Sequence, residues 1–158
     1  MLRIFALTKE HWKGQLVFVG LRLTPTLRSL GEELGIIDRI VEVEGASNDL
    51  LEALYNGAVA LLYPSRFEGF GWPIIEAQAC GCPVICADRE PMAEVAGDAG
   101  LRLEVEDEAA MARAVLSLTN PEERERWSEK SLQNVRRFDA EEMVAQYIAL
   151  YRTLGAAV

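Results

Sequence analysis

Residues 58–87 constrain the fold of this chain more than any other stretch. Residues 58–63 form a short apolar run that ends at a proline, as expected for a buried strand that leads into a loop. Pro73 suits the start of a helix, because proline in the first helical turn loses no hydrogen bond. The helix is predicted to end at Gly81, and residues 84–87 form the next apolar run. The stretch therefore predicts strand, glycine turn, helix and strand in that order.

Apolar runs and helix patterns alternate along the rest of the chain as well. Residues 1–11 fit either a helix or a short strand, and we favour the helix. The other expected strands span residues 16–19, 40–43 and 101–104, and the other expected helices span residues 24–34, 47–55, 107–118, 120 to a break near 138, and 141–154. This alternation predicts βαβ units. We therefore expect a single α/β domain, residues 1–158, with a doubly wound, Rossmann-like parallel sheet.

Two loops are expected at the edge of this sheet where ligands bind. Residues 45–48 and 64–71 each follow a predicted strand, and ligands of such sheets lie outside the carboxyl ends of the strands. The strand at residues 16–19 is an unbroken apolar run, which is typical of a strand covered by helices on both faces.

The second of these loops carries the residues with the clearest chemistry. Glu68 lies in the loop and Glu76 about one turn into the helix, while Gly69, Phe70 and Gly71 lie between them. The glycines would let a ligand approach the backbone, and Phe70 could form a wall of the pocket. The first N–H groups of a helix favour an anion, and an ionised carboxylate can accept hydrogen bonds from paired hydroxyls. The pattern thus indicates a ligand with both hydroxyls and a phosphate.

The two glutamates are also compatible with different roles. Glu76 could merely complement the charge of a helix N-terminus, and Glu68 could be a solvated loop charge. A hydrolase could use one carboxylate as acid and the other as nucleophile or base, but that reaction needs a fixed separation that a sequence does not give. A dehydrogenase is disfavoured, because no G-x-G-x-x-G motif follows a predicted strand.

Residues 68–84, EGFGWPIIEAQACGCPV, resemble the glutamate-pair signature of the retaining group 1 glycosyltransferases, in which seven residues separate the two glutamates. The similarity continues into residues 93–100, AEVAGDAG, and reaches back to residues 16–20 and 38–45. The resemblance implies the carboxyl-terminal, donor-binding half of a two-domain GT-B enzyme. It also implies a nucleoside diphosphate sugar as ligand, a hexose as the transferred group, and a reaction without a metal ion.

The resemblance also implies roles for individual residues. Glu68 would accept hydrogen bonds from the transferred sugar and be the catalytic residue, and Glu76 would hold the ribose hydroxyls. The amides of residues 69–71 would approach the sugar and the distal phosphate. Ser65 and Arg66 are weaker candidates for donor binding, Arg66 because it could lend positive charge to a phosphate.

The chain departs from the family pattern at its start. The family's donor half normally opens with a strand followed by an arginine and a lysine, whereas Lys13 and Gly14 precede the strand at residues 16–19. We therefore expect that the opening strand of the family's donor half and the N-terminal acceptor-binding domain are both missing. The chain alone is then expected to transfer sugar poorly or not at all. The acceptor-binding domain, or a separate chain that carries it, is then an expected partner. The alternative is a non-catalytic subunit that binds a nucleotide sugar or serves as a scaffold for another glycosyltransferase chain.

Composition and charge exclude some partners. The net charge of −9 disfavours nucleic acid and anionic lipid, and we see neither an apolar run of membrane length nor a secretory leader at Met1. We expect a cytoplasmic protein, with peripheral association at the inner membrane left open through a missing domain or partner. Self-association into a homo-oligomer through an exposed sheet edge is also a hypothesis.

Two groups of side chains are predicted to be structural. Cys80, Cys82 and Cys86 lack the spacing and partners of a metal or redox site, so we interpret them as small, mostly buried thiols. Trp127, Tyr147 and Tyr151 lie in predicted helices, where aromatic side chains usually belong to the core. A surface for a partner is the alternative for these three aromatic residues.

Overall fold

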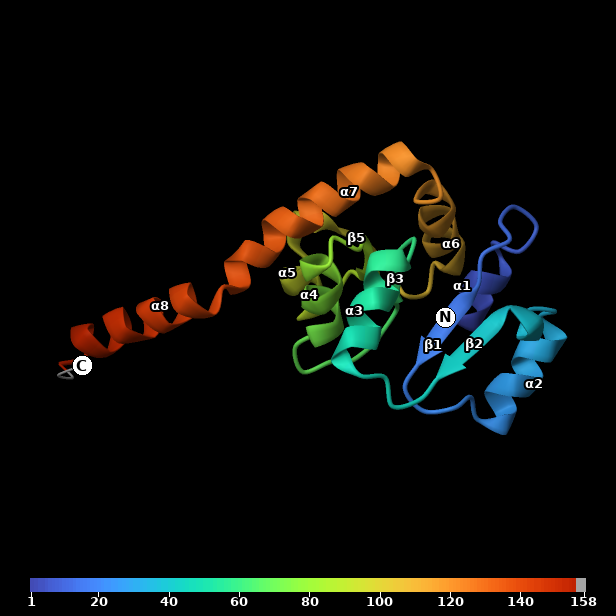
Figure 1. Cartoon of the computed structure of the whole chain (residues 1–158), viewed down its shortest axis with the longest axis horizontal. Helices are drawn as coiled ribbons and strands as arrows, with labels where there is room; N and C mark the ends of the chain where they lie inside the picture. The colour runs from blue at the N-terminus through green and yellow to red at the C-terminus, as the bar shows by residue number, and fades with distance from the viewer. Residues whose placement is uncertain (156–158) are drawn as a thin grey trace.

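A computed structural model describes residues 1–155 of the chain (Figure 1). Among these residues, no helix combines the length and the apolar composition needed to cross a membrane. The elements follow one another as α1 (Leu2–Ala6), β1 (Leu16–Val19), α2 (Pro25–Glu33), η1 (Ile37–Arg39), β2 (Ile40–Val43), α3 (Asn48–Gly57), β3 (Leu61–Tyr63), α4 (Trp72–Ala79), β4 (Val84–Ala87), α5 (Met92–Ala96), η2 (Gly97–Ala99), β5 (Gly100–Leu103), α6 (Glu108–Ser117), α7 (Pro121–Asn134), η3 (Val135–Phe138) and α8 (Ala140–Thr153).

The strands form parallel sheets flanked by helices, which confirms the predicted α/β class. β1 pairs with β2, and β3 pairs with β4, which in turn pairs with β5. Within the described residues these are two separate sheets of two and three strands, with no pairing between β1 and β3. Figure 1 shows β1 and β2 beside α2, and α7 lying across the part that contains β3, β4 and β5.

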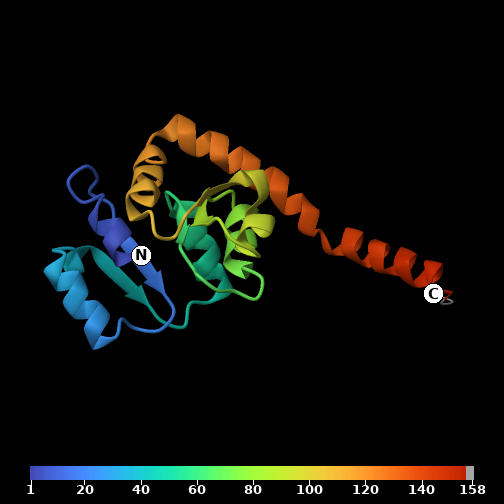
Figure 2. The ribbon, with the colours of Figure 1, turned by 180° about the vertical axis from the view of Figure 1, so that it is seen from behind.

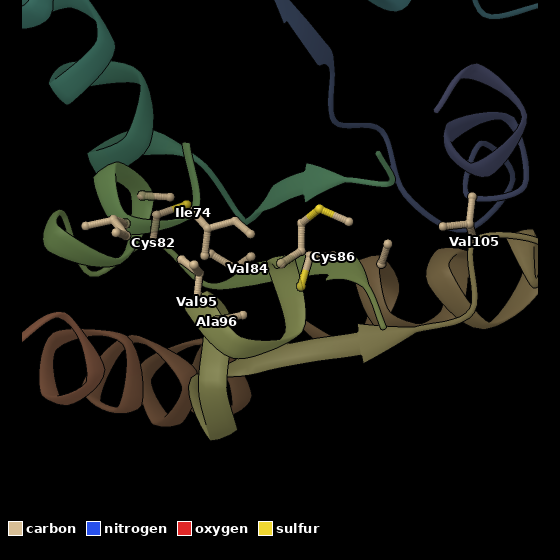
Figure 3. Packing of buried hydrophobic residues seen from close by; sticks show 11 residues of the cluster. Ile74, Cys82, Val84, Cys86, Val95, Ala96 and Val105 are labelled. Carbon is tan, nitrogen blue, oxygen red and sulfur yellow. The ribbon is translucent and has the colours of Figure 1, made fainter. Parts of the chain in front are cut away.

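The main core is built around β4, in which every residue is buried. On one face of this strand, Val84 and Cys86 pack with side chains of α4 and α5, including Ile74 and Val95 (Figure 3), and on the other face Ile85 packs with side chains of α1 and α6. Cys82 belongs to the same cluster. Burial on both faces explains why this strand reads as an unbroken apolar run.

A second and a third cluster join the N-terminal part to this core. Ile4 of α1 packs with Ile85 of β4 and with Met111 of α6, while Phe5 and Leu16 pack with Ile36. These contacts place α1 between the two sheets, so that the short helix links them.

An arginine side chain fixes the loop between α1 and β1. The Nε of Arg39 donates to the carbonyl of Gly14 at 2.9 Å, and its Nη2 donates to the carbonyl of Trp12 at 2.9 Å. The guanidinium also lies 4.8 Å from the centre of the Phe5 ring. Such charged hydrogen bonds are stronger than neutral ones, so one side chain holds this loop against the third cluster.

Several helix starts follow the expected chemistry. The side chains of Thr24, Ser47 and Asn120 cap α2, α3 and α7 by accepting from backbone N–H groups of the first turn. Gly81, just beyond the end of α4, has φ +66°, which a glycine adopts without strain.

The structure corrects several predicted boundaries. The strand predicted at residues 58–63 begins only at Leu61, because Ala58 still closes α3 by donating to the carbonyl of Tyr55. Within the helix favoured for residues 1–11, only Leu2–Ala6 is helical and turns follow. The strand predicted at residues 101–104 is shifted by one residue, to Gly100–Leu103.

The expectation that β1 is covered on both faces is wrong. Leu16 is buried, but Val17 and Val19 are 39% and 40% exposed. Helices α1 and α2 therefore cover one face of the β1–β2 sheet, while side chains of the other face remain accessible.

The last helix extends away from the body of the molecule, as Figures 1 and 2 both show. Tyr147 and Tyr151 of α8 are 54% and 49% exposed, so the core interpretation is wrong for both. Their positions on the helix place them side by side, with ring centres 6.4 Å apart. Trp127 of α7 is half-buried against the second cluster, which confirms the core interpretation for that residue.

A buried amide joins α4, α5 and α7 and gives a first test of the fold. Gln78 is fully buried, its Nε2 donates to the carbonyl of Ala96 at 3.1 Å, and its Oε1 accepts from Asn134 at 2.8 Å. Gln78→Leu should lower the free energy of unfolding by ~1–3 kcal/mol, because the buried carbonyl of Ala96 and the partly buried amide of Asn134 each lose a hydrogen bond. Urea unfolding followed by circular dichroism measures the change.

Gln146→Leu is the matched control for this substitution. Gln146 is exposed on α8 and bonds only to Glu142 at 3.1 Å among the described residues, so its replacement should change stability by less than ~0.5 kcal/mol. Equal effects of the two substitutions would contradict the role assigned to Gln78.

Candidate functional site

The loop of residues 64–71 connects β3 to α4 at the carboxyl end of β3. Gly71 is the N-cap residue of α4 and has φ +104°, a conformation that other residues rarely adopt. A Cβ added there would also lie 3.4 Å from Cδ1 of Ile74. Gly69 has no such constraint, since no atom lies within 4 Å of the position of its missing Cβ. Gly71 thus determines the turn, and Gly69 leaves space beside it.

No side chain caps the N-terminus of α4 within the described residues. The N–H of Ile74 bonds to the carbonyl of Gly71 at 2.9 Å, and Pro73 has no N–H to offer. The first turn of a helix carries a partial positive charge. Here this charge faces a loop that contains exposed glutamate and glycine.

Each of the two glutamates has a tyrosine partner. The hydroxyl of Tyr55, on α3, donates to Oε2 of Glu76 at 3.3 Å. Burial, the charge of Glu76 and this hydrogen bond raise the pKa of Tyr55 well above its usual value. Burial and the neighbouring Glu68 carboxylate do the same to the pKa of Tyr63. Both hydroxyls are therefore protonated at neutral pH and available as donors.

Both carboxylates act on Tyr63. Beside the effects of burial and of Glu68, the charge of Glu76 also contributes to the raised pKa of this tyrosine. Glu68 and Glu76 are exposed, and an ionised carboxylate has more acceptor sites than one tyrosine can use. Both predicted glutamates therefore act on the same tyrosine, and each keeps acceptor positions that no tyrosine occupies.

Sequence reasoning missed the two tyrosines as site residues. Tyr63 ends β3 directly before the loop, which was a usable signal because side chains at such strand ends face the ligand edge. Tyr55 lies at a distance of 21 residues from Glu76 along the chain, and only the packing of α3 against α4 shows the pair.

A cavity of about 770 Å³ reaches this cluster. Tyr55, Tyr63, Pro73 and Glu76 line one end of it, and β1, β3 and α3 line much of the rest. Glu68 and Phe70 are outside its lining. Glu76 therefore borders the cavity, whereas Glu68 does not line it.

The weaker candidates are engaged with neighbours. The Oγ of Ser65 donates to the carbonyl of Phe67 at 3.3 Å, which tightens the loop itself. Arg66 forms an ion pair with Glu106 at 2.9 Å, and Arg89 approaches the same carboxylate at 3.6 Å. The role of Arg66 toward a phosphate stays a prediction.

Phe70 anchors the loop to the body of the domain. Its ring centre lies 5.1 Å from that of Trp72 and 6.2 Å from that of Phe138 in η3. The half-buried ring packs against the main core. This packing holds the glycine turn in place, while a contact of Phe70 with ligand stays a prediction.

The cysteines are free, and two of them are packing residues. Cys82 and Cys86 are buried, and burial raises the pKa of each thiol to about 12. Thiols of this kind remain protonated at neutral pH and react slowly. Residues 1–155 contain no group of three or more histidine, cysteine, aspartate or glutamate side chains that could hold a metal ion.

Comparison with known proteins identifies similar sequences. A family model described as "Glycosyl transferases group 1" matches residues 1–134. O-antigen chain mannosyltransferase B of Escherichia coli is 39% identical over 105 residues, covering 66% of this chain and 28% of that protein. D-inositol 3-phosphate glycosyltransferase of Corynebacterium glutamicum is 35% identical over 136 residues, covering 84% of this chain and 32% of that protein. The chain thus spans less than a third of these curated relatives.

Solved structures show the same fold. Sucrose-phosphate synthase from Thermosynechococcus elongatus matches with a TM-score of 0.82 and 27% identity over 99% of this chain and 43% of that chain. Anabaena HepE in complex with UDP matches with a TM-score of 0.83 over 96% of this chain and 44% of that chain. At 18% identity the second match shows the fold alone.

The link between Glu68 and Tyr63 predicts a measurable titration. Glu68→Gln should lower the pKa of Tyr63 toward its ordinary value, because the substitution removes a negative charge that disfavours the tyrosinate. Tyrosinate absorbance, followed as pH rises, should then appear at lower pH than in the unsubstituted protein. Glu125→Gln, on the exposed surface of α7, is the control and should leave the titration unchanged. Identical curves for all three proteins would show that Glu68 and Tyr63 do not interact.

Proposed function

The chain belongs to the glycosyl transferases group 1 family, and on that premise we propose that it is the donor-binding domain of a retaining glycosyltransferase. It would bind a nucleoside diphosphate sugar and present the hexose for transfer to an acceptor. The observation that carries the proposal is the cluster of two exposed carboxylates beside the uncapped N-terminus of α4. The mannosyltransferase and inositol phosphate glycosyltransferase activities named for two relatives agree with this class of reaction.

Glu76 is proposed to hold the ribose. Its carboxylate lies at the end of the cavity, and the hydroxyl of Tyr55 occupies one acceptor position. The remaining lone pairs can accept hydrogen bonds from two vicinal hydroxyls, which is the arrangement that a ribose offers. Tyr55 would orient the carboxylate for this contact without touching the ligand.

Glu68 is proposed as the catalytic residue. It would accept hydrogen bonds from the transferred sugar and thereby position the glycosyl bond, which is an effect of orientation. The backbone of Gly69, Phe70 and Gly71 would approach the sugar and the distal phosphate, helped by the open space at Gly69. The N-terminus of α4 would stabilise negative charge on the departing diphosphate. The transfer would proceed without a metal ion.

Transfer is proposed to need a second, acceptor-binding domain. In a two-domain enzyme the acceptor side closes over the donor and excludes water. The chain is therefore expected to bind donor but to transfer sugar poorly by itself. A non-catalytic subunit would differ in one respect, since it would bind nucleotide sugar without turnover even when an acceptor-binding half is supplied.

Calorimetric titration with UDP, GDP, ADP and their common sugar conjugates tests the proposal. One nucleotide should bind, and Glu76→Ala should weaken its binding at least tenfold, because a hydrogen bond to a charged group contributes ~1.5–3 kcal/mol. Glu68→Ala should remove the preference for the sugar conjugate over the free nucleoside diphosphate.

Glu125→Ala is the control and should bind like the unsubstituted protein. Failure of every nucleotide to bind a folded chain would sink the donor-site proposal for residues 1–158 alone. If neither glutamate substitution changes binding, the nucleotide binds at a different site.

A further inference from the structure

One carboxylate connects three loops at the same edge of the β3–β4–β5 sheet. Arg66 lies in the loop after β3, Arg89 in the loop after β4, and Glu106 in the loop after β5. Because the three strands are parallel, these loops all lie at the carboxyl ends of the strands, where ligands of such sheets bind. One oxygen of Glu106 lies 2.9 Å from Nη1 of Arg66, and the other lies 3.6 Å from Nη2 of Arg89. The two arginines, which we call the arginine pair, thus share a single carboxylate.

The acidic residues on either side of Arg89 are directed to other partners. An oxygen of Asp88 lies 3.9 Å from Nε of Arg102, and Oε2 of Glu90 accepts a hydrogen bond from the N–H of Glu94 at 3.2 Å. In the described part of the chain, neither carboxylate forms an ion pair with the arginine pair. One shared carboxylate therefore faces two guanidinium groups, and one of their positive charges stays uncompensated within the group.

The ion pairs with Glu106 are accessible to water. The side chains of Arg66 and Glu106 are 60% and 54% exposed, and that of Arg89 is 36% exposed. Ion pairs at such exposed positions contribute little to stability. A guanidinium group has five N–H donors, and its planar shape matches the oxygens of a phosphate. A phosphate can thus replace the carboxylate at small cost, and it brings a larger negative charge and more acceptor oxygens.

We propose that Arg66 and Arg89 form a binding site for a phosphate group, and that Glu106 is an internal competitor whose carboxylate occupies this site. The phosphate would bridge both guanidinium groups and displace Glu106. The loops after β3 and β4 would then stay connected through the ligand, while the loop after β5 would be released. The phosphate belongs either to the diphosphate of a nucleotide sugar or to a different phosphorylated molecule.

The phosphate site is distinct from the cavity beside the candidate site. Neither the arginine pair nor Glu106 lines the cavity that Tyr63 and Glu76 border. The inference depends on the two ion pairs and on the charge of the group, and not on the proposed donor site. Either can therefore fail alone.

The alternative role for Glu106 is a structural tie between the loops. In that role the carboxylate would hold both guanidinium groups in place for a ligand, and its removal would weaken phosphate binding. A competitor has the opposite effect, because its removal frees the donors that the phosphate needs. The two roles thus predict changes of opposite sign.

Titration of the whole chain with inorganic pyrophosphate at constant ionic strength tests the site. The Nε–Hε signals of arginines in ¹⁵N NMR report on each guanidinium group separately. The signals of Arg66 and Arg89 should shift along saturable curves with the same dissociation constant. Arg66→Gln and Arg89→Gln should each weaken binding roughly tenfold, because each removes a charged hydrogen-bond donor. Arg113→Gln, on the exposed surface of α6, is the control and should leave binding unchanged.

Glu106→Gln distinguishes the competitor from the structural tie. It should strengthen pyrophosphate binding about fivefold, because the side chain keeps its shape but loses the charge of an exposed ion pair. Glu104→Gln is the matched control, since Glu104 is exposed in the same loop and carries the same charge. It should change the affinity by less than about twofold. In a chain that also carries Arg66→Gln and Arg89→Gln, Glu106→Gln should have no effect.

Competition experiments identify the source of the phosphate. UDP, GDP and ADP are each titrated into the chain, and inorganic phosphate is then added to the saturated complex. A nucleotide that shifts the signals of the arginine pair and blocks inorganic phosphate assigns the site to the donor diphosphate. Inorganic phosphate that still binds beside the nucleotide assigns the site to a different molecule. Binding of pyrophosphate without binding of any nucleotide would leave the phosphate site intact and contradict the donor-site proposal.

Three outcomes would overturn the inference. Weaker binding of pyrophosphate to Glu106→Gln would make Glu106 a structural tie. Equal effects of Glu104→Gln and Glu106→Gln would mean that only the net charge of the surface acts. Absence of saturable shifts, or shifts that persist unchanged in both arginine variants, would exclude the phosphate site. Thermal unfolding followed by circular dichroism checks that every variant is folded.

Discussion

The burial of β4 on both faces is the constraint on which the rest of the structure depends. This strand pairs with β3 on one side and with β5 on the other, while α4 and α5 pack over one of its faces and α1 and α6 pack over the other. Because β3 is held in register by β4, the position of Tyr63 and of the following loop is determined by core packing. The candidate site is thus attached to the fully buried strand of the core, which suits a site that must position a ligand.

Buried polar contacts keep the helices of this core in a defined arrangement. Gln78 connects α4 to the end of α5 and to Asn134 of α7, and all its partners lie on different elements. Gly97 permits this close approach, since a Cβ there would lie 2.7 Å from Oδ1 of Asn134. Helix α4 is therefore tied to α5 and α7 through Gln78, and displacement of α4 would break both hydrogen bonds of this side chain.

The candidate site adjoins the cavity that Tyr63 and Glu76 line. The hydroxyl of Tyr55 donates to the exposed carboxylate of Glu76, and the Glu68 carboxylate raises the pKa of Tyr63, so both carboxylates remain exposed beside a tyrosine. The adjoining cavity is apolar and bordered by two unpaired strand edges. The proposed donor-binding residues thus lie at the border of a mostly apolar cavity.

The sequence by itself determined the α/β class, most element boundaries and the glycine turn before α4, while the roles of Glu68 and Glu76 stay predictions. These features are local: they follow from apolar periodicity, from capping residues such as Thr24 and Ser47, and from a motif within one loop and helix. Tertiary structure alone decided the rest. The partnership of Tyr55 with Glu76, the separation of the strands into two sheets and the exposure of Tyr147 and Tyr151 depend on which elements pack together. Contacts between distant residues arise from the packing of whole elements, and a single sequence carries no local signal for them.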